Sequence, residues 1–438
     1  MLSALVPGLG QAYNGRRRLA TWLFAPFAIV AALAVLVVWA IPGPRLLATV
    51  IVPGTIDALL ALNLVVLGWR LVAAGQAFFD TRFEVRPGPV ALVGLAVVVL
   101  ATVVPHVAGQ YVGGLAKSTF AEVFDGAVLG ARSDTERGPV PGVNDRLNVL
   151  LVGIDAGKGR DHALTDSLIV VSVDPVGKSV SMASLPRDLV NVPLGDGRTF
   201  APKLNSLLSY ATAHPKDFPA GGMRTLENAV GALLGIPINY YATIDLNGFI
   251  KMVDAVGGVD IDVKTALDDP KYRGFGVKHG WSVGVGLNHF NGIDALAYAR
   301  IRRSTGQTDF TRQARQQEIL MALRAKVLKG GALLSLPSLL DAVGDTISTD
   351  FPAERLPDLA VLAGEIPAKR IVRVVVRYPL VHPARPGENQ YGAVQLPDTD
   401  RIAAMAAGLF PAPGTSPKRW NPKDTPSPSA APSPAPSG

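Results

Sequence analysis

The chain has 438 residues, a formal net charge of +7 and no cysteine, and 48% of its residues are hydrophobic. The absence of cysteine excludes thiol catalysis, disulfides and cysteine-based metal sites. The positive charge suits an anionic partner such as nucleic acid, a membrane surface or a phosphorylated glycan.

Three apolar runs with almost no charged residues lie in the first quarter of the chain, over residues 19–41, 46–69 and 90–108. Each is as long as a bilayer-spanning helix, roughly 17–25 residues. Helices buried in a large soluble core are the alternative, and the near absence of charge disfavours it. The sequence therefore predicts an α-helical membrane region of about three transmembrane helices over residues 1–112.

Two polar residues interrupt the second run. We expect Asp57 and Asn63 to serve interhelical packing, although an intramembrane carboxyl is also a functional candidate. The opening segment, 4-ALVPGLGQAYNGR-16, resembles the turn-rich start of small two-helix membrane modules.

Basic residues around the apolar runs predict how the chain is oriented in a cell membrane. Arg16, Arg17 and Arg18 precede the first run, Arg70, Arg82 and Arg86 lie between the second and third, and only Arg45 lies between the first two. Because positively charged flanks stay in the cytoplasm, the N-terminus is predicted to be cytoplasmic. After three crossings, the chain beyond residue 110 is predicted to lie outside, which makes nucleic acid the least favoured anionic partner.

The rest of the chain divides into a connector, one domain and a tail. Residues 113–144 mix Gly, Ser, Asp and Pro without periodicity, which is typical of a juxtamembrane linker. Residues 412–438 are rich in Pro, Ser and Ala and are expected to be disordered, because they bury too little apolar surface. Between them, residues 145–411 are predicted to form one extracytoplasmic catalytic domain.

This domain alternates strand-like and helix-like segments. Strands are predicted at 147–154, 167–173, 179–185, 238–244, 259–263 and 371–377, and helices at 203–213, 223–234, 248–256, 311–329 and 398–409. Near-continuous apolar strands interleaved with helices indicate a sheet covered on both faces. The predicted fold is therefore α/β, a three-layer αβα sandwich with a mixed central sheet.

Three polar residues are predicted to meet at one edge of this sheet. The segment 174-DPVGK-178 favours a tight antiparallel turn between the second and third strands. If the first strand also pairs with the second, Asp155, Asp166 and Arg187 converge on one rim. Two carboxylates and an arginine suit Mg²⁺ bridging to a phosphate. The alternative is that they are ordinary loop and strand-entry residues with a surface ion pair.

Five arginines gather in 295-ALAYARIRRSTGQTDFTRQARQQ-317. Tyr298, Arg300 and Arg302 alternate as they would in a short strand, which would place both arginines on one face. A solvated helix face is the alternative for such a run, and it explains Arg303 and Arg315 better than it explains the other arginines.

A helix is predicted to follow this short strand. Thr308 or Asp309 can cap it, and Arg312 and Gln316 lie four apart on one face. Arginines from the strand and from the start of the helix are therefore predicted to surround one anion.

Several ordered motifs resemble those of a known family. They are 153-GIDAGKGRDHALTDSLIVV-171, 184-SLPRD-188, 203-KLN-205, 240-YYATIDLNGFIKMVDAVGGVDIDV-263, 287-LNHFNGIDALAYARIR-302 and 309-DFTRQARQQ-317. In these motifs, over a core of residues 147–320, the chain resembles the LytR–CpsA–Psr (LCP) family of cell-envelope proteins.

The resemblance implies a phosphotransferase that depends on Mg²⁺, with Mn²⁺ as a substitute. It would move a glycopolymer from a polyprenyl-pyrophosphate carrier onto peptidoglycan through a phosphodiester link, at a lipid membrane and without nucleic acid. The polyprenyl chain would lie in an apolar groove between the sheet and the helices.

The resemblance also implies roles for individual residues. By motif position, Asp155 and Asp166 would ligate the metal. The pyrophosphate would be bound by Arg187, Lys203, Arg300, Arg302, Arg312 and Gln316. The expected catalytic residues are Arg187, Arg300, Arg302, Arg312 and Asp188. Asp188 and Asp161 are the candidates for a general base, and each could instead orient an arginine.

The chain departs from the family pattern in two places. The family often has Arg where this chain has Leu164, so that one phosphate contact is missing or is supplied by Arg160. The stretch after Asn205 is longer than usual before the glycine pair Gly221 and Gly222. The second departure concerns the acceptor side of the site.

Three other functions remain open from the sequence. The same site could hydrolyse a polyprenyl pyrophosphate, since only the acceptor differs. A membrane-bound regulator that binds nucleic acid would need residues 295–317 in the cytoplasm and lacks the interleaved aromatics of single-strand readers. A lipid- or glycan-binding scaffold without turnover is the third. His162, His279 and His289 lack metal-ligand spacing, and we expect them to be loop residues.

Overall fold

The structure, a computed structural model, describes residues 2–41, 46, 49, 53–80, 88–124, 141–142, 144–155, 164–329, 346–384 and 390–422. The chain forms two compact units. The first comprises Met1–Ala121 with Pro352–Val361, and the second comprises Glu122–Phe351 with Leu362–Gly438.

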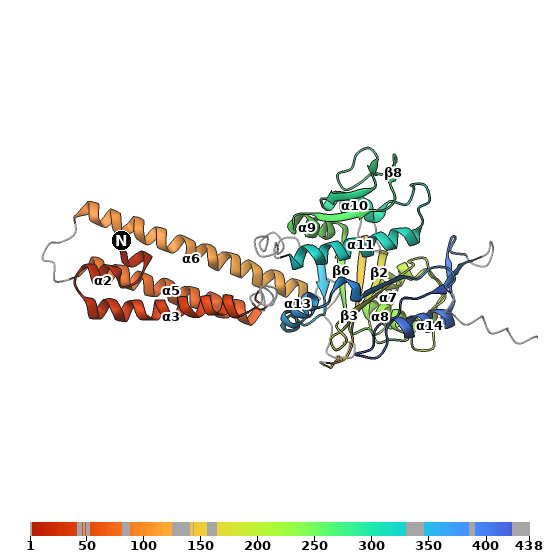
Figure 1. Cartoon of the computed structure of the whole chain (residues 1–438), viewed down its shortest axis with the longest axis horizontal. Coiled ribbons are helices and arrows are strands. Elements are labelled where there is room, and N and C mark those ends of the chain that lie inside the picture. Colours follow the sequence, from red (N-terminus) through yellow and green to blue (C-terminus); the bar gives the residue numbers. More distant parts are fainter. Residues whose placement is uncertain are drawn as a thin grey trace, which may run out of the picture. The chain divides into compact units, whose positions relative to one another are not determined.

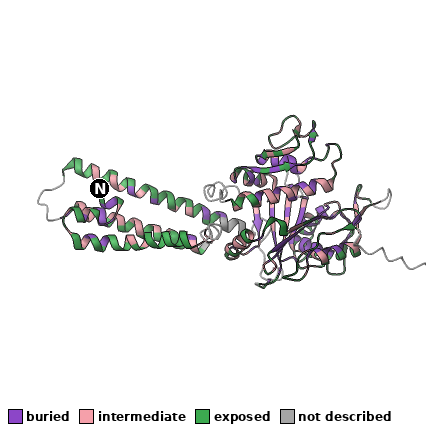
Figure 2. Cartoon of the chain, in the orientation of Figure 1, coloured by how far each residue is buried: buried purple, intermediate pink, exposed green. Residues whose placement is uncertain are grey.

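The first unit is helical. Its elements are α1 (Leu2–Leu5), α2 (Leu9–Tyr13), α3 (Arg17–Ala40), α5 (Pro53–Phe78) and α6 (Pro89–Phe124). Three helices are long and apolar enough to cross a membrane, over Arg17–Ala40, Gly54–Phe78 and Pro89–Thr119. Most of their apolar side chains are exposed (Figure 2), which suits contact with lipid rather than with water. The prediction of a membrane region with about three transmembrane helices is confirmed.

One boundary of the expected linker is wrong. Helix α6 continues to Phe124, so the first part of residues 113–144 is helical. Most of the remaining linker, residues 125–140 and 143, lies outside the described residues.

Polar residues of the spans contact neighbouring helices. Asp57 of α5 pairs with Lys117 of α6 at 2.7 Å. The Asn63 Oδ1 accepts from the His106 Nδ1 at 2.6 Å, and the Asn63 Nδ2 donates to the His106 carbonyl at 2.9 Å. The expectation of interhelical packing is confirmed for both residues. Arg70 lies inside α5 and donates to the Ala4 carbonyl, so it does not belong to the loop between the second and third runs.

The opening segment packs tightly against the membrane helices. Gly8 has φ 99°, and a Cβ there would lie 2.5 Å from the Ala20 carbonyl oxygen. Gln11 is fully buried and donates to the Ala73 carbonyl and to Gln76 of α5. The glycine and glutamine of this segment therefore have specific packing roles.

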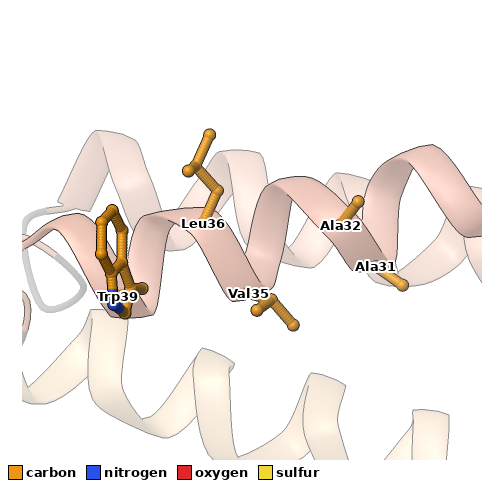
Figure 3. A pocket seen from close by; sticks show the side chains of 5 residues that line it. All are labelled: Ala31, Ala32, Val35, Leu36 and Trp39. Carbon is orange, nitrogen blue, oxygen red and sulfur yellow. The ribbon is translucent and has the colours of Figure 1, made fainter.

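The surface of α3 carries a shallow depression of about 460 Å³ (Figure 3). Its lining is Ala31, Ala32, Val35, Leu36 and Trp39. These side chains carry no charged group that could bind a phosphate, and Trp39 stands in the last turn, where amphipathic rings meet the membrane interface. The depression therefore belongs to the apolar helix surface.

The second unit is built on a six-stranded mixed sheet in the order β11-β6-β1-β2-β3-β12. Its strands are β1 (Leu147–Asp155), β2 (Leu164–Asp174), β3 (Ser179–Leu185), β6 (Tyr240–Asp245), β11 (Ile347–Thr349) and β12 (Ile371–Val375). Strand β2 runs antiparallel to both β1 and β3, whereas β6 and β12 run parallel to β1 and β3. Strand β11 is antiparallel to β6.

Helices cover both faces of this sheet (Figure 1). One face packs on α7 (Leu207–Ala213), α8 (Gly222–Leu234) and α14 (Thr399–Leu409) through the main apolar core, which includes Leu150, Val152, Leu168 and Val170. The other face packs on α9 (Leu246–Ala255) and α11 (Asp309–Leu328). The predicted three-layer αβα sandwich is confirmed.

A small second core lies beside the sheet. Strand β7 (Val259–Val263) pairs with β10 (Gly286–Phe290) and not with the central sheet, and α10 (Gly292–Arg300) follows β10.

The predicted short strand at residues 298–302 is wrong. Asn291 caps α10 by accepting from the Asp294 amide at 2.9 Å, and the Ala- and Leu-rich sequence that follows favours a helix.

The remaining elements are short. The strand pairs are β4 (Val192–Pro193) with β5 (Thr199–Phe200), β8 (Leu267–Asp269) with β9 (Trp281–Val283), and β13 (Val381–Pro383) with β14 (Gln395–Pro397). Helix α13 spans Leu356–Glu365, and the 3₁₀ turns are η3 (Leu204–Ser206), η6 (Ala353–Arg355) and η7 (Ala368–Arg370).

The first part of the expected disordered tail is held against the second unit. The Pro411 and Thr415 carbonyls accept from Arg146, and the Gly414 amide donates to Asp174 at 2.9 Å. Trp420 packs on the main core. The prediction of disorder is therefore wrong for residues 412–422, because backbone contacts to a buried ion pair replace the missing apolar surface. Residues 423–438 lie outside the described part.

Candidate functional site

The ends of three strands meet at one edge of the sheet, as predicted. In the strand pairing, Asp155 lies opposite Leu164 and Leu168 lies opposite Leu185, so the end of β1, the start of β2 and the end of β3 share this edge. The turn at residues 174–178 closes the β2–β3 hairpin at the opposite edge. We call the shared edge the rim.

A β-bulge places Asp166 at the rim. The pairing of β1 with β2 shifts by one residue between Gly153 and Ile154, which leaves Asp166 as the extra residue of β2. The Thr165 hydroxyl consequently donates to the Asn205 carbonyl in η3, while the Ser167 hydroxyl donates to Gln316 in α11. In a regular strand these two hydroxyls would share a face, so the bulge redirects the start of β2.

The corner between α10 and α11 is fixed by local contacts. Thr308 caps α11 and forms a capping box with Thr311. Arg315 is 5% exposed and donates to the carbonyls of Tyr298 (2.7 Å) and Ile301. The interpretation of Arg315 as part of a solvated helix face is wrong, whereas Arg303 is exposed as expected. Arg315 holds the backbone on both sides of Arg300.

Two arginines of this corner flank one carboxylate. Arg312 is 4% exposed, and its Nη2 lies 2.7 Å from Asp309 and 3.4 Å from the Asp166 carbonyl. Arg302 lies 3.8 Å from the same Asp309 oxygen. Burial lowers the pKa of Arg312, the neighbouring Arg187 and Arg302 act in the same direction, and Asp309 opposes them. Asp309 therefore bridges two guanidinium groups and is not the helix cap.

Arg187 joins the strand ends to this arginine pair. Its Nη1 donates to Asp166 at 2.6 Å, and its Nε lies 3.8 Å from Asp188. Lys203 donates to the other oxygen of Asp188 at 2.8 Å. Burial acts to lower the pKa of Arg187, but Asp166, with Asp188 and Asp309, raises it above its ordinary value. The guanidinium therefore stays charged.

Arg300 completes the cluster from the end of α10. Its Nη2 lies 3.5 Å from Asp155, which is 6% exposed, and its guanidinium lies 5.3 Å from the centre of the Phe275 ring. The structure thus brings together all nine expected site residues: Asp155, Asp166, Arg187, Asp188, Lys203, Arg300, Arg302, Arg312 and Gln316. Their chemical roles stay a prediction.

Five other residues named from the sequence are not part of the described rim. Arg160, Asp161 and His162 lie outside the described residues. His279 is in the connection between β8 and β9, as expected, but His289 is in β10, where it contacts Asp260 at 2.7 Å. The expectation of a loop position is therefore wrong for His289.

Three contributors to the site were not predicted from the sequence. They are Ser167, Asp309 in its bridging role, and Gln317, which is buried and donates to the Ser184 hydroxyl and the Val374 carbonyl. The available signal was helical spacing, because Arg312, Arg315 and Ile319 recur at steps of three and four and are all buried. Such spacing indicates a helix face that packs inward.

The rim offers two carboxylates as candidate ligands for the expected Mg²⁺. No group of three or more His, Asp or Glu side chains within the described ranges is close enough to hold a metal by protein ligands alone. Mg²⁺ commonly takes one or two carboxylates and completes its octahedron with water and phosphate oxygens. Asp155 and Asp166, which come from paired strands, supply such a donor set.

Comparison with known proteins agrees with these observations. The model of the LytR–CpsA–Psr family (LytR_cpsA_psr) matches residues 125–405. The chain is 29% identical over 216 residues to the polyisoprenyl-teichoic acid–peptidoglycan teichoic acid transferase TagU of Bacillus mycoides, covering 49% of this chain and 64% of that protein. It is 31% identical over 238 residues to the corresponding transferase TagV of Bacillus subtilis, covering 52% and 56%. The matches span less than two thirds of either relative.

Among solved structures, the crystal structure of Bacillus subtilis TagV aligns with 61% of this chain and 98% of its own, at 27% identity and a TM-score of 0.48. The family model covers more than half of the 438 residues and includes every residue of the rim. The chain therefore belongs to the LytR–CpsA–Psr family.

Proposed function

We propose that the chain is a phosphotransferase that moves a glycopolymer from a polyprenyl-pyrophosphate carrier to peptidoglycan. The observation that carries this proposal is the convergence of four arginines on three carboxylates at and beside the rim. The arginines are Arg187, Arg300, Arg302 and Arg312, and the carboxylates are Asp155, Asp166 and Asp309. The relatives TagU and TagV are named as teichoic acid transferases that act between a polyisoprenyl carrier and peptidoglycan, which supports the same reaction type.

In the proposed reaction, a hydroxyl of peptidoglycan attacks the glycan-side phosphorus of the pyrophosphate. The bond between this phosphorus and the bridging oxygen breaks, polyprenyl phosphate leaves, and the proton of the acceptor hydroxyl passes to the departing phosphate or to water. Such a transfer depends mostly on positioning and on stabilising charge in the transition state. Four guanidinium groups suit this task because each offers a planar set of donors for phosphate oxygens.

The arginines are oriented before any substrate binds. Asp155, Asp166 and Asp309 each contact at least one of them at 2.6–3.8 Å. Donors that are held in place do not need to reorganise when charge develops, which is the main advantage of a preorganised site.

We further propose that Asp155 and Asp166 bind Mg²⁺, which Mn²⁺ can replace. Bound there, the ion would neutralise charge on the two phosphates. Lys203 and Gln316 are proposed to add contacts to the same phosphate oxygens.

Asp188 is proposed to position its neighbours. Its two oxygens face Lys203 (2.8 Å) and Arg187 (3.8 Å). Both carboxylate oxygens therefore face cations of the site, as in a residue that orients its neighbours. This arrangement supports the orienting role over that of the general base.

The polyprenyl chain is proposed to lie on the α11 side of the sheet. On this face the central strands carry Val149, Leu151 and Val171, which are only half-buried, whereas Leu150 and Val170 on the opposite face are fully buried. Incomplete cover over apolar side chains of central strands suits an apolar ligand.

The proposed location is the cell membrane, with the N-terminus cytoplasmic and the second unit outside. Arg16, Arg17 and Arg18 at the start of α3 support this orientation. With this orientation, the site would meet a lipid-linked donor and peptidoglycan on the same side of the membrane, and nucleic acid is not a proposed partner.

The test uses the full-length protein in neutral-lipid nanodiscs with a polyprenyl-pyrophosphate-linked glycan and a peptidoglycan fragment. Released polyprenyl phosphate and coupled glycan are both measured. We expect Arg300→Gln to lower coupling about 10²–10³-fold, and the exposed Arg303→Gln to leave it unchanged.

The outcomes separate the alternatives. Release without coupling would identify a hydrolase. Binding of the lipid-linked donor with no turnover would leave a carrier-binding protein and contradict the proposal.

A further inference from the structure

A basic loop stands next to Arg300. Residues 270–280, PKYRGFGVKHG, join β8 to β9 (Figure 1), and we call them the basic loop. Lys271, Arg273 and Lys278 are exposed, and the loop has no Asp or Glu. Within the described part of the chain, none of these three side chains takes part in an ion pair. Asp268 and Asp269 precede the loop, and Asp269 accepts from the Lys271 amide at 3.0 Å, but neither forms an ion pair with these cations. Three exposed cations without an ion pair favour an anionic partner.

Two aromatic residues connect the basic loop with the rim. The Phe275 ring lies 5.3 Å from the Arg300 guanidinium, which is a cation–π distance. Burial raises the pKa of Tyr272, and the positive charge of Arg300 acts against this shift, as expected for close neighbours. The basic loop therefore lies directly beside Arg300 of the proposed pyrophosphate site.

The loop has a defined shape. Phe275 has φ 49°, between Gly274 (φ 119°) and Gly276 (φ 92°), and a left-handed conformation at Phe persists only when surrounding contacts impose it. Gly274 and Val277 exchange two backbone hydrogen bonds of 3.0 and 3.1 Å. The Gly280 amide donates to the Tyr272 carbonyl at 3.1 Å.

The base of the hairpin is also attached to the site corner. The Trp281 indole donates to Asp294 of α10 at 2.9 Å, and the Asp268 amide donates to the Ser304 hydroxyl at 3.0 Å. The basic loop is thus a supported surface beside Arg300, and its cations have fixed backbone positions.

We propose that the basic loop binds the glycan chain of the donor where that chain leaves the pyrophosphate, and that it selects polymers that carry repeated negative charge, such as phosphodiester-linked glycans. This inference rests on the proposed function, because that function places the pyrophosphate at Arg300. Lys271 and Lys278 contact anionic groups along the chain as flexible point charges, and Arg273 offers a planar set of donors to them. Recognition by charge tolerates different sugars, and salt weakens it.

The first test measures binding without catalysis. The full-length protein in phosphatidylcholine nanodiscs is titrated into a short, labelled poly(glycerol phosphate) chain without lipid, and anisotropy is recorded. The variant Lys271→Gln/Arg273→Gln/Lys278→Gln is compared with Lys216→Gln/Lys251→Gln/Lys369→Gln, which removes the same charge from exposed positions elsewhere in the second unit. We expect about tenfold weaker binding for the loop variant at low salt, a smaller salt dependence, and no change for the control.

The second test measures transfer from two polyprenyl-pyrophosphate donors, one with an anionic and one with a neutral glycan. For the anionic donor, the loop variant should raise KM about tenfold and leave kcat unchanged. Transfer from the neutral donor should not change. An equal loss with both donors would indicate that the loop only maintains the site and would overturn the inference.

Two further outcomes are decisive. If the loop variant binds poly(glycerol phosphate) as well as the wild type, or loses binding only to phosphatidylserine vesicles, the loop is not a glycan surface. If the wild type transfers neither glycan but the loop variant loses poly(glycerol phosphate) binding, the phosphotransferase proposal fails while the binding surface stands.

Discussion

At the scale of single residues, neighbouring arginines of one helix differ in what they bind. Arg312 faces Asp309 and the rim, whereas Arg315, three positions on, donates to the carbonyls of Tyr298 and Ile301. Burial lowers the pKa of Arg315 to about 10, while Tyr298 and Glu318 oppose this shift. At neutral pH the side chain therefore keeps its charge and all of its donors.

This difference predicts the effect of removing Arg315. Arg315→Met leaves two buried carbonyls without donors, which should lower the free energy of unfolding by about 3 kcal/mol. The loss is measurable as a lower thermal midpoint of the full-length protein in detergent. Transfer should also fall, because Arg300 and Arg302 lie on either side of the released backbone.

The control is Arg303→Met, which removes an exposed arginine of the same corner and should change neither quantity. Arg315→Lys should recover part of the stability, since one ammonium can reach one carbonyl. A midpoint equal to the wild type for Arg315→Met would refute the structural role.

Residue identities at the rim were predictable because strand order and a tight turn determine where strand ends meet. Asp155, Asp166 and Arg187 followed from that geometry, and the arginines of 295–317 followed from their density and from family motifs. The bridging of Arg302 and Arg312 by Asp309 was not predictable, because capping and ion pairing are both open to an acidic residue at a helix start.

At the scale of elements, the position of Arg300 depends on how α10 meets α9. A Cβ on Gly292 would lie 2.2 Å from the Ile250 carbonyl oxygen, and the Gly292 amide donates to Asp254 at 2.7 Å. The first turn of α10 thus lies against the backbone of α9. Any displacement at this end moves the whole helix, which ends with Arg300.

Gly292→Ala should therefore disturb the site from a distance. We expect a destabilisation of about 1–3 kcal/mol from overpacking and a lower kcat for transfer, with the central sheet retained. Thermal unfolding, steady-state kinetics and circular dichroism measure these effects. Gly284→Ala is the matched control, since a Cβ there meets nothing within 4 Å.

If Gly292→Ala left both stability and transfer unchanged, the contact between α9 and α10 would not determine the position of Arg300.

Element types were predicted best where continuous apolar runs mark buried strands. The strands at 147–154, 167–173 and 179–185 carry long apolar runs, and the structure has a strand at each. The strand predicted at residues 298–302 was wrong because Tyr298, Arg300 and Arg302 alternate by chance. Asn291 and the helix-forming residues after it indicate a helix instead. The bulge at Asp166 had no local signal, because it depends on how two strands pair.

At the scale of the whole molecule, the proposed metal links stability to activity. Asp155 and Asp166 come from the two paired strands β1 and β2, so an ion held by both would also hold the rim together. Chelation should abolish transfer, and added Mg²⁺ or Mn²⁺ should restore it. Because an ion that binds only the folded state stabilises it, Mg²⁺ should also raise the thermal midpoint.

Asp166→Asn should remove the Mg²⁺-dependent rise of the midpoint, and calorimetric titration should detect weaker metal binding. Asp262→Asn, an exposed carboxylate of β7, is the control and should keep the rise. Full transfer in the presence of a chelator would refute the requirement for a metal.

The attachment of residues 411–415 to Arg146 and Asp174 has a mechanical consequence. Arg146, immediately before β1, binds the carbonyls of Pro411 and Thr415, and Asp174 at the end of β2 binds Arg146 and the Gly414 amide. The segment before β1 and residues 411–415 therefore meet at one corner of the second unit, at the edge of the sheet opposite the rim. Tension between the segment before Leu147 and the segment after Trp420 would load this corner in shear and would bypass the strand ends that carry Asp155, Asp166 and Arg187. The rim in this way lies outside the path of a pull between these two segments.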